Sequence, residues 1–307
     1  MIWALLLLAG IAAAPFVIEA LRRPMNAAAR KSAPGAFIDL SQGVTHYQWS
    51  GPADGPVIVC IHGLTTPSFV WQGLRPMLER RGFRVLTYDL YGRGYSDRPK
   101  GVQNPAFFLQ QLNDLLASQD VRTDITVIGY SMGGAIATLF AADRPQGIRR
   151  MVLLAPAGMR PVGSGLFKAA VQNAVLGRWV MLSLYPSILR KGLRAEAHVP
   201  SSVPGINALQ HAELTWRGFV PAVHSSLLGM LSDGLAAEHA SLAQQKIPVM
   251  AIWGAADDVI PLVAKDQLAE WNPNAAQRVI PDAGHGLTYT HCDEIDALLA
   301  PFLAKDA

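Results

Sequence analysis

The sequence predicts an α/β protein with a mostly parallel central sheet flanked by helices, a helical insertion and an apolar N-terminal helix. Short apolar runs with strand character alternate with helix-like patterns over most of the chain, and this alternation builds parallel sheets by right-handed crossovers. The alternation stops near residue 158 and resumes near residue 247, which indicates an insertion. Residues 1–18 contain no charged side chain, which sets them apart from the rest.

Length and charge limit the function classes. The chain has 307 residues, half of them hydrophobic, which is enough for one large domain with an insertion. The formal net charge of +3 is small, and the basic residues form no long run or aromatic-rich patch. A nucleic-acid-binding role is therefore excluded.

Metal and cofactor signals are also missing from the sequence. Cys60 and Cys292 have no Cys-x-x-Cys or Cys/His ligand spacing, and both are predicted to be reduced thiols in the core. The histidines of the insertion lack metal-ligand spacing, and the glycines beside Arg93 lack the third glycine of a dinucleotide-binding loop. We therefore expect no metal and no cofactor.

The N-terminal segment predicts a membrane anchor. As a helix, residues 1–18 would be about 27 Å long, just enough to cross a bilayer. Basic residues follow this run at Arg22, Arg23, Arg30 and Lys31. The positive-inside rule then puts the N-terminus outside and the rest of the chain in the cytoplasm.

The alternative for this segment is a cleaved signal peptide, with export of the remainder. Basic residues normally precede such a signal, but none does here, and Pro15 follows the small residues where cleavage would occur. We assign residues 1–21 to an anchor or signal sequence. Residues 22–35, rich in Ala, Lys, Ser, Pro and Gly towards their end, are assigned to a linker.

The predicted core covers residues 36–157 and 247–307. It begins with an alternating pattern over residues 37–49, typical of a β-hairpin, in which His46 lies on the more polar side and is expected at the surface or an edge. A helix is predicted over residues 68–81, ending at Gly82. Further strands are predicted at residues 56–61, 83–89, 125–128, 151–154, 248–254 and 278–280. The insertion, residues 158–246, contains aromatic and aliphatic residues in helix-like segments.

One stretch indicates nucleophilic catalysis. Residues 127–134 pass from an apolar strand through Ser131 directly into an apolar helix, with Gly129 and Gly133 two residues on either side of the serine. A tight turn between strand and helix exposes a serine hydroxyl at the carboxyl end of a sheet. The helix N-terminus offers the Met132 amide to a developing oxyanion.

In these motifs the chain resembles the α/β-hydrolases, from residue 36 to the end. Gly129-Tyr130-Ser131-Met132-Gly133 resembles the nucleophile elbow of that family, and His62-Gly63-Leu64-Thr65 resembles its oxyanion loop. Residues 89–96 match the Asp-x-x-Gly-x-Gly-x-Ser turn, residues 253–261 the acid loop, and residues 283–286 the histidine loop. The order Ser, Asp, His along the chain is the family order.

The resemblance implies roles for particular residues. Ser131 would be the nucleophile, His285 the general base and Asp257 the acid that orients the histidine. Asp258 is a neighbouring alternative, but Asp257 occupies the family's Trp-Gly-x-x-Asp position. The amides of Leu64 and Met132 would hold the oxyanion, Thr65 would line the site, and His62 is assigned to the same oxyanion and substrate region, where it would prop the loop by hydrogen bonding.

The resemblance also implies a substrate class. The apolar insertion resembles a cap, so we expect a serine hydrolase acting on an apolar carboxylic ester, such as a medium-chain ester or a monoacylglycerol-like lipid. A carbon–carbon bond or lactone hydrolase of a small metabolite is the alternative. A non-catalytic binding protein of the same fold is a third possibility. The sequence contains no signal for an oligomeric state.

Overall fold

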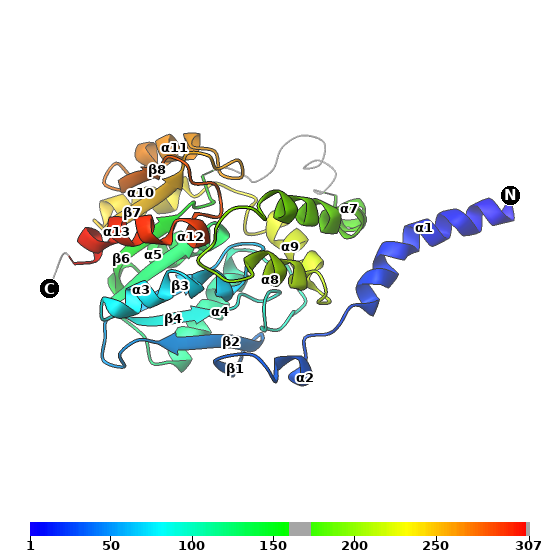
Figure 1. Ribbon diagram of the computed structural model, residues 1–307, viewed down its shortest axis with the longest axis horizontal. Coiled ribbons are helices and arrows are strands. Elements are labelled where there is room, and N and C mark those ends of the chain that lie inside the picture. The colour runs from blue at the N-terminus through cyan, green and yellow to red at the C-terminus, as the bar shows by residue number, and fades with distance from the viewer. Residues whose placement is uncertain (160–172, 305–307) are drawn as a thin grey trace.

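A computed structural model describes residues 1–159 and 173–304 of the chain. Its centre is an eight-stranded sheet in the order β1-β2-β4-β3-β5-β6-β7-β8, with helices on both faces and α1 extending away from the body (Figure 1). The strands are β1 (Ala36–Leu40), β2 (Gly43–Ser50), β3 (Val57–Ile61), β4 (Arg84–Tyr88), β5 (Ile125–Tyr130), β6 (Ile148–Leu154), β7 (Val249–Gly254) and β8 (Ala276–Ile280). The predicted α/β fold class is confirmed.

Strand direction follows from the connections. β1 and β2 pair antiparallel, as the tight hairpin between them requires, and β2 also pairs antiparallel with β4. From β4 through β3, β5, β6, β7 and β8 all pairs are parallel, because a helical crossover separates consecutive strands. The carboxyl ends of the parallel strands therefore share one edge of the sheet, and ligand sites of open α/β sheets lie outside that edge.

Alternate strand residues face two separate cores. Val59 and Ile61 of β3 join the core on one face, whereas Ile58 and Cys60 join the core on the other. All four are fully buried, as expected for a central strand covered on both sides. Cys60 and Cys292 are both buried and unbonded, as the sequence predicted.

The helices of the predicted core lie on these two faces or in the connections between strands. They are η1 (Ser68–Gln72), α3 (Arg75–Arg80), α4 (Pro105–Ser118), α5 (Met132–Asp143), η2 (Pro145–Gly147), α11 (Val263–Trp271), α12 (Leu287–Thr290) and α13 (Cys292–Leu303). The single helix predicted over residues 68–81 is wrong, because the structure divides it into η1 and α3. Pro76 cannot donate to the carbonyl of Gln72, and Gly73 lies against Ser202 and Cys292 with no room for a Cβ.

Between β6 and β7 the described part of the insertion is helical. It contains α7 (Ala174–Ala195), α8 (Ile206–Glu213), α9 (Phe219–Leu228) and α10 (Ala236–Gln244), while residues 160–172 of the predicted insertion lie outside the described residues. Residues of α7 and α9 share a small separate core. Leu242 of α10 instead joins the core of the sheet, so α10 belongs with the sheet layers although the predicted boundary at residue 246 includes it.

The N-terminal helix α1 (Ile2–Leu21) is long and apolar enough to cross a membrane, with a mean hydropathy of 2.2 over its most apolar window. Most of its large apolar side chains are exposed. One long apolar helix near the N-terminus is consistent with either a membrane anchor or a signal sequence.

The segment after α1 is attached to the body. Arg23 pairs with the chain around Trp216, with Arg23 N donating to Thr215 O at 3.2 Å and Arg217 N donating to Arg23 O at 2.9 Å. The guanidinium of Arg23 also covers the Trp216 ring at 4.3 Å. Residues assigned to a linker are thus hydrogen-bonded to the turn between α8 and α9, and part of this segment forms a short helix, α2 (Ala27–Arg30).

Candidate active site

Ser131 occupies a strained turn between β5 and α5. Its φ of 52° lies in the left-handed region, which is costly for a residue with a Cβ and is common at functional sites. A Cβ at Gly133 would clash with the carbonyl oxygen of Ile61, and one at Gly129 would clash with the carbonyl of Gly133. Both glycines therefore allow the close backbone approach that produces the turn.

Three predicted residues meet at the carboxyl edge of the sheet. Ser131 follows β5, Asp257 follows β7 and His285 follows β8. The distance from His285 Nε2 to Ser131 Oγ is 2.9 Å, and from His285 Nδ1 to Asp257 Oδ2 it is 2.8 Å. This is the geometry of a nucleophile, a base and a group that orients the base.

The environment distinguishes Asp257 from Asp258. The Asp257 side chain is 1% exposed, and its Oδ1 accepts hydrogen bonds from the amides of Val259 at 2.8 Å and Ile260 at 2.7 Å. These donors fix the carboxylate and leave Oδ2 for His285. Asp258 is exposed and lies outside this arrangement.

Tyr130 is a further residue of this site that the sequence analysis did not identify. Its hydroxyl donates to the backbone carbonyl of His285 at 3.1 Å, and the two rings lie 5.4 Å apart between centroids. Tyr130 thereby connects the nucleophile turn to the histidine loop. The only sequence signal was its place before Ser131, where the motif accepts many residue types.

The predicted oxyanion residues lie on two segments beside Ser131. Met132 is the first residue of α5, where the amide has no carbonyl within the helix to donate to. Across from it, a Cβ on Gly63 would lie 3.2 Å from the Ser131 Cβ, so the loop after β3 packs directly on the serine. Leu64 and Thr65 of this loop are partly exposed, and Arg93 Nε donates to the Leu64 carbonyl at 3.0 Å.

His62 lies behind this loop and is fully buried. Its Nδ1 contacts the Gly63 carbonyl at 2.8 Å, and the Leu90 amide donates to its Nε2 at 2.8 Å. Burial lowers the pKa of His62 to about 4, against smaller opposing effects of Asp89 and Gly63. The neutral ring is therefore placed to hold the loop, with both nitrogens engaged by the backbone.

Comparison with known proteins gives the family. A sequence model of the alpha/beta hydrolase fold matches residues 56–291, which is more than half of the chain. The chain belongs to the alpha/beta hydrolase fold family. In this family a serine, an acid and a histidine occur in the order found here.

Two curated relatives and one solved structure are similar to this hydrolase. A 2-hydroxymuconate semialdehyde hydrolase from a Pseudomonas species is 27% identical, over 81% of this chain and 87% of the relative. A pimeloyl-[acyl-carrier protein] methyl ester esterase from Aliivibrio salmonicida is 25% identical, over 85% of this chain and 97% of the relative. The enol-lactonase structure from Burkholderia xenovorans has a TM-score of 0.71 and 22% identity, covering 87% of this chain and 99% of that one, and shows the shared fold.

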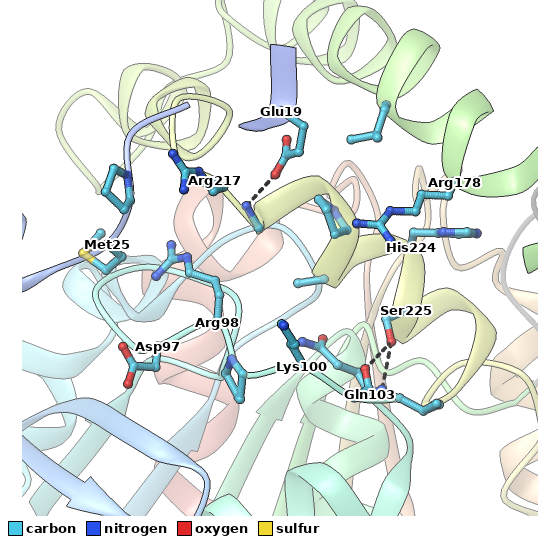
Figure 2. A pocket seen from close by; sticks show the side chains of 18 of the residues that line it. Glu19, Met25, Asp97, Arg98, Lys100, Gln103, Arg178, Arg217, His224 and Ser225 are labelled. Atoms are coloured by element: carbon cyan, nitrogen blue, oxygen red, sulfur yellow. Dashed lines mark hydrogen bonds between the residues drawn. The ribbon is translucent and has the colours of Figure 1, made fainter. Parts of the chain in front are cut away.

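A large cavity of this hydrolase lies away from the serine. Its volume is about 1110 Å³, and it is lined by the end of α1, the loop from Asp97 to Gln103, α7 and α9 (Figure 2). Neither Ser131 nor His285 lines it. The cavity is therefore not the catalytic pocket.

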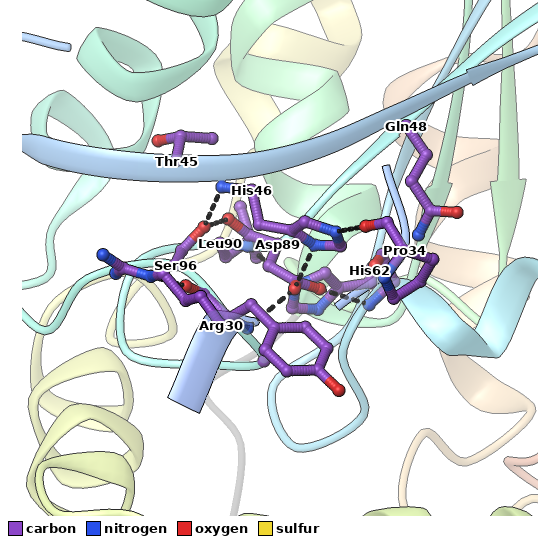
Figure 3. A network of polar contacts seen from close by, with 12 residues as sticks. Arg30, Pro34, Thr45, His46, Gln48, His62, Asp89, Leu90 and Ser96 are labelled. Atoms are coloured by element: carbon purple, nitrogen blue, oxygen red, sulfur yellow. Dashed lines mark hydrogen bonds and ion pairs between the residues drawn. The ribbon is translucent and has the colours of Figure 1, made fainter. Parts of the chain in front are cut away.

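A buried polar network lies beside the oxyanion loop (Figure 3). Asp89 accepts from the amides of Ser68 and Tyr95, both at 2.9 Å, and lies 2.7 Å from His46 Nδ1. Burial alone raises the pKa of Asp89, but the hydrogen bond and charge of His46 and the further donors hold it well below its usual range. Asp89, just after β4, is thus a buried carboxylate that connects His46 of β2 to Ser68 at the start of η1.

The prediction that His46 lies at the surface is wrong, because only 1% of it is exposed. Its Nε2 contacts the Pro34 carbonyl, and the rings of Phe37 and Tyr95 each lie 5.2 Å away between centroids. Burial lowers the pKa of His46, but the hydrogen bond and charge of Asp89 raise it overall. The segment before β1, which includes Pro34, covers His46, although the alternating pattern of its strand indicates an exposed position.

Within the described ranges, no group of three or more His, Cys, Asp or Glu side chains is arranged to hold a metal ion.

Proposed function

We propose that the protein is a serine esterase that cleaves carboxylic esters through an acyl-enzyme. The observation that supports this most directly is the continuous contact from Ser131 Oγ through both nitrogens of His285 to Asp257, at 2.9 and 2.8 Å. A serine hydroxyl becomes a useful nucleophile only when such a base is within hydrogen-bonding distance.

In this proposal Ser131 Oγ attacks the ester carbonyl carbon as its proton moves to His285 Nε2. The resulting imidazolium is stabilised by the Asp257 carboxylate and then protonates the leaving alcohol. Water deprotonated by His285 attacks the acyl-enzyme, and the proton returns to Ser131 as the carboxylic acid departs. The amides of Met132 and Leu64 would stabilise the negative oxygen in both steps.

We further propose an apolar substrate, namely a medium-chain ester or a monoacylglycerol-like lipid. The cap would lie within residues 158–246, and the described part of this insertion contributes apolar side chains, such as Met181, Phe219 and Val223. We propose that α1 anchors the protein in a membrane, with the catalytic domain on the cytoplasmic side, because Arg22 and Arg23 follow the apolar helix. The exposed apolar surface of α1 supports this placement.

A carbon–carbon bond or lactone hydrolase is the second candidate. The similarity to a 2-hydroxymuconate semialdehyde hydrolase and to an enol-lactonase structure favours it, whereas the similarity to a pimeloyl methyl ester esterase favours an ester. Both candidates use the same serine and histidine, so only substrate turnover separates them.

Labelling with a fluorophosphonate, followed by a panel of p-nitrophenyl esters of increasing acyl length, tests the proposal. We expect labelling of the protein, no labelling of the Ser131→Ala variant, and turnover that peaks at a medium acyl length. Labelling with flat or absent ester turnover would favour the second candidate. An unlabelled, folded protein would indicate a non-catalytic binding protein.

A further inference from the structure

The cavity at the end of α1 joins the predicted anchor to the body of the protein. Phe16, Glu19 and Ala20 of α1 line one side of it. The other sides come from the loop after β4, from α7 and from α9 with the residues just before it. Since Leu21 is the last residue of α1, the cavity opens where the apolar helix ends, at the level expected for lipid headgroups.

The acidic residues that line the cavity have basic partners outside its lining. Glu19 pairs with Arg22 at 2.9 Å and accepts from the Gly218 amide at 2.6 Å. Asp97 pairs with Arg30 at 2.6 Å. Neither Arg22 nor Arg30 lines the cavity, so each carboxylate of the lining has its ion-pair partner outside it, and Glu19 interacts with Arg178 and Arg217 of the lining only through charge at longer range.

Four basic side chains line the same cavity: Arg98, Lys100, Arg178 and Arg217 (Figure 2). Within the described part of the chain, Lys100 and Arg178 form no ion pair and no side-chain hydrogen bond. Arg217 donates from Nε to the Arg22 carbonyl and forms no ion pair there, although its charge, like that of Arg178, acts on Glu19 from a distance. The lining therefore carries excess positive charge.

Arg98 adds an unsatisfied donor to this cluster. Its terminal nitrogens donate to the carbonyls of Ser96 and Gly94 and lie 3.9 Å from Glu213. Its Nε is buried and has no hydrogen-bond partner. A buried N–H without a partner is costly, and an anion in the cavity could accept from it.

Apolar groups complete the lining. Phe16 lies on α1, Leu182 on α7, Pro221 and Leu228 on α9, and Val102 in the loop after β4. A cluster of cations beside an apolar wall that continues along an exposed apolar helix suits an anionic amphiphile. Guanidinium groups match phosphate oxygens in charge and geometry.

We propose that this cavity binds the phosphate headgroup of an anionic glycerophospholipid from the membrane that α1 enters, with its acyl chains leaving along Phe16. The inference rests on the proposed membrane anchoring and is independent of the proposed ester chemistry. The bound lipid contacts α1, the loop after β4, α7 and α9 together. It therefore fixes the inserted helices relative to the membrane surface.

The test measures lipid binding to the full-length protein in a non-ionic detergent by isothermal titration calorimetry. The protein carries Ser131→Ala, so that ester hydrolysis cannot affect the result. The three probes are dioctanoyl phosphatidylglycerol, dioctanoyl phosphatidylcholine and inorganic phosphate. We expect saturable binding of phosphatidylglycerol, at least about tenfold tighter than binding of either other probe.

The variant Lys100→Glu/Arg178→Glu should weaken phosphatidylglycerol binding about tenfold or more, because both charges are reversed at exposed positions. Lys100→Gln/Arg178→Gln should also weaken phosphatidylglycerol binding, and it replaces the double charge reversal if that variant does not fold. The control Lys191→Glu reverses an exposed charge of α7 outside the cavity and should leave binding within about twofold.

Equal affinity for the two lipids, or an equal loss in the Lys191→Glu control, would overturn the proposal. If inorganic phosphate binds as tightly as phosphatidylglycerol, the proposal of a lipid ligand is overturned and a soluble phosphate ligand is indicated. Fluorophosphonate labelling of the parent protein is recorded separately. Absent labelling with intact lipid binding would refute the hydrolase proposal alone, and the converse would refute the lipid site alone.

Discussion

Asp257 is held by two backbone amides, so its carboxylate keeps one fixed orientation towards His285. Asn at this position retains size and hydrogen bonding but removes the charge that, in the proposed mechanism, would stabilise the imidazolium. We expect Asp257→Asn to lower kcat about 10²-fold or more. The control Asp258→Asn alters an exposed neighbour and should change kcat by less than about twofold. Steady-state kinetics on a short ester measures both, and the reverse order would transfer the orienting role to Asp258.

The oxyanion proposal makes a separate prediction for Leu64. A backbone donor survives a change of side chain, so Leu64→Ala should lower kcat less than about fivefold, whereas Leu64→Pro removes the amide and should cost about 10²-fold or more. Circular dichroism checks that both variants fold. Equal losses in two folded variants would show that the Leu64 amide is not an oxyanion donor.

The sequence predicted some residues of the site and missed others for a physical reason. Ser131, Asp257 and His285 each stand in a local motif, so their positions at strand ends could be predicted. Tyr130 and His46 could not, because their roles depend on segments distant in sequence, the histidine loop and the chain around Pro34. A local pattern does not report such contacts.

The end of α8 carries a buried acid that should make stability depend on pH. The Glu213 side chain is 6% exposed, accepts from the Gly94 amide at 3.0 Å, and lies 3.9 Å from Arg98. Burial raises the pKa of Glu213 to about 7 from an ordinary value of 4.5, although Arg98 and Gly94 act against it. The folded state therefore holds this proton more tightly than the unfolded state does.

The sign of the effect follows from that difference. The stabilising contribution of protonated Glu213 is fully present below about pH 4.5 and is lost as the pH rises to about 7, a change of at most roughly 3 kcal/mol. Glu213→Gln cannot ionise, so it should match the parent at pH 5 and have the higher Tm at pH 8. Thermal unfolding at both values measures this, and parallel Tm curves would contradict it.

Predictability also differed among the elements. The strands could be predicted because continuous apolar runs between Gly, Pro and polar residues leave little choice of structure. The single helix predicted over residues 68–81 was wrong because Pro76 has no amide to continue the helical hydrogen bonds, so the segment divides into η1 and α3. The packing of α10 on α5 and α11 depends on tertiary contacts, which helical periodicity does not report.

For the molecule as a whole, the region between anchor and core was the least predictable. Its composition indicates a linker, but Arg30 donates to the Tyr95 carbonyl and pairs with Asp97, while Arg23 pairs with the chain at Trp216. These contacts join residues far apart in sequence. The N-terminal helix is therefore attached to the turn between α8 and α9, so the proposed membrane anchor would be connected mechanically to the proposed cap.

The contacts of Arg30 with Tyr95 and Asp97 determine how much of the N-terminus can be removed without loss of stability. A chain starting at Met25 keeps α2 with its Asn26 cap and the Arg30 contacts, so it should be soluble and labelled by fluorophosphonate at the parent rate. A chain starting at Ala33 loses Arg30 and should show a lower Tm.

On esters held in vesicles, the Met25 form should be about tenfold slower than the full-length protein, because the anchor raises the local concentration at the surface. Carbonate washing of membranes tests whether α1 anchors the protein. Full-length protein in the soluble fraction, or a processed form outside the cytoplasm, would identify α1 as a secretion signal.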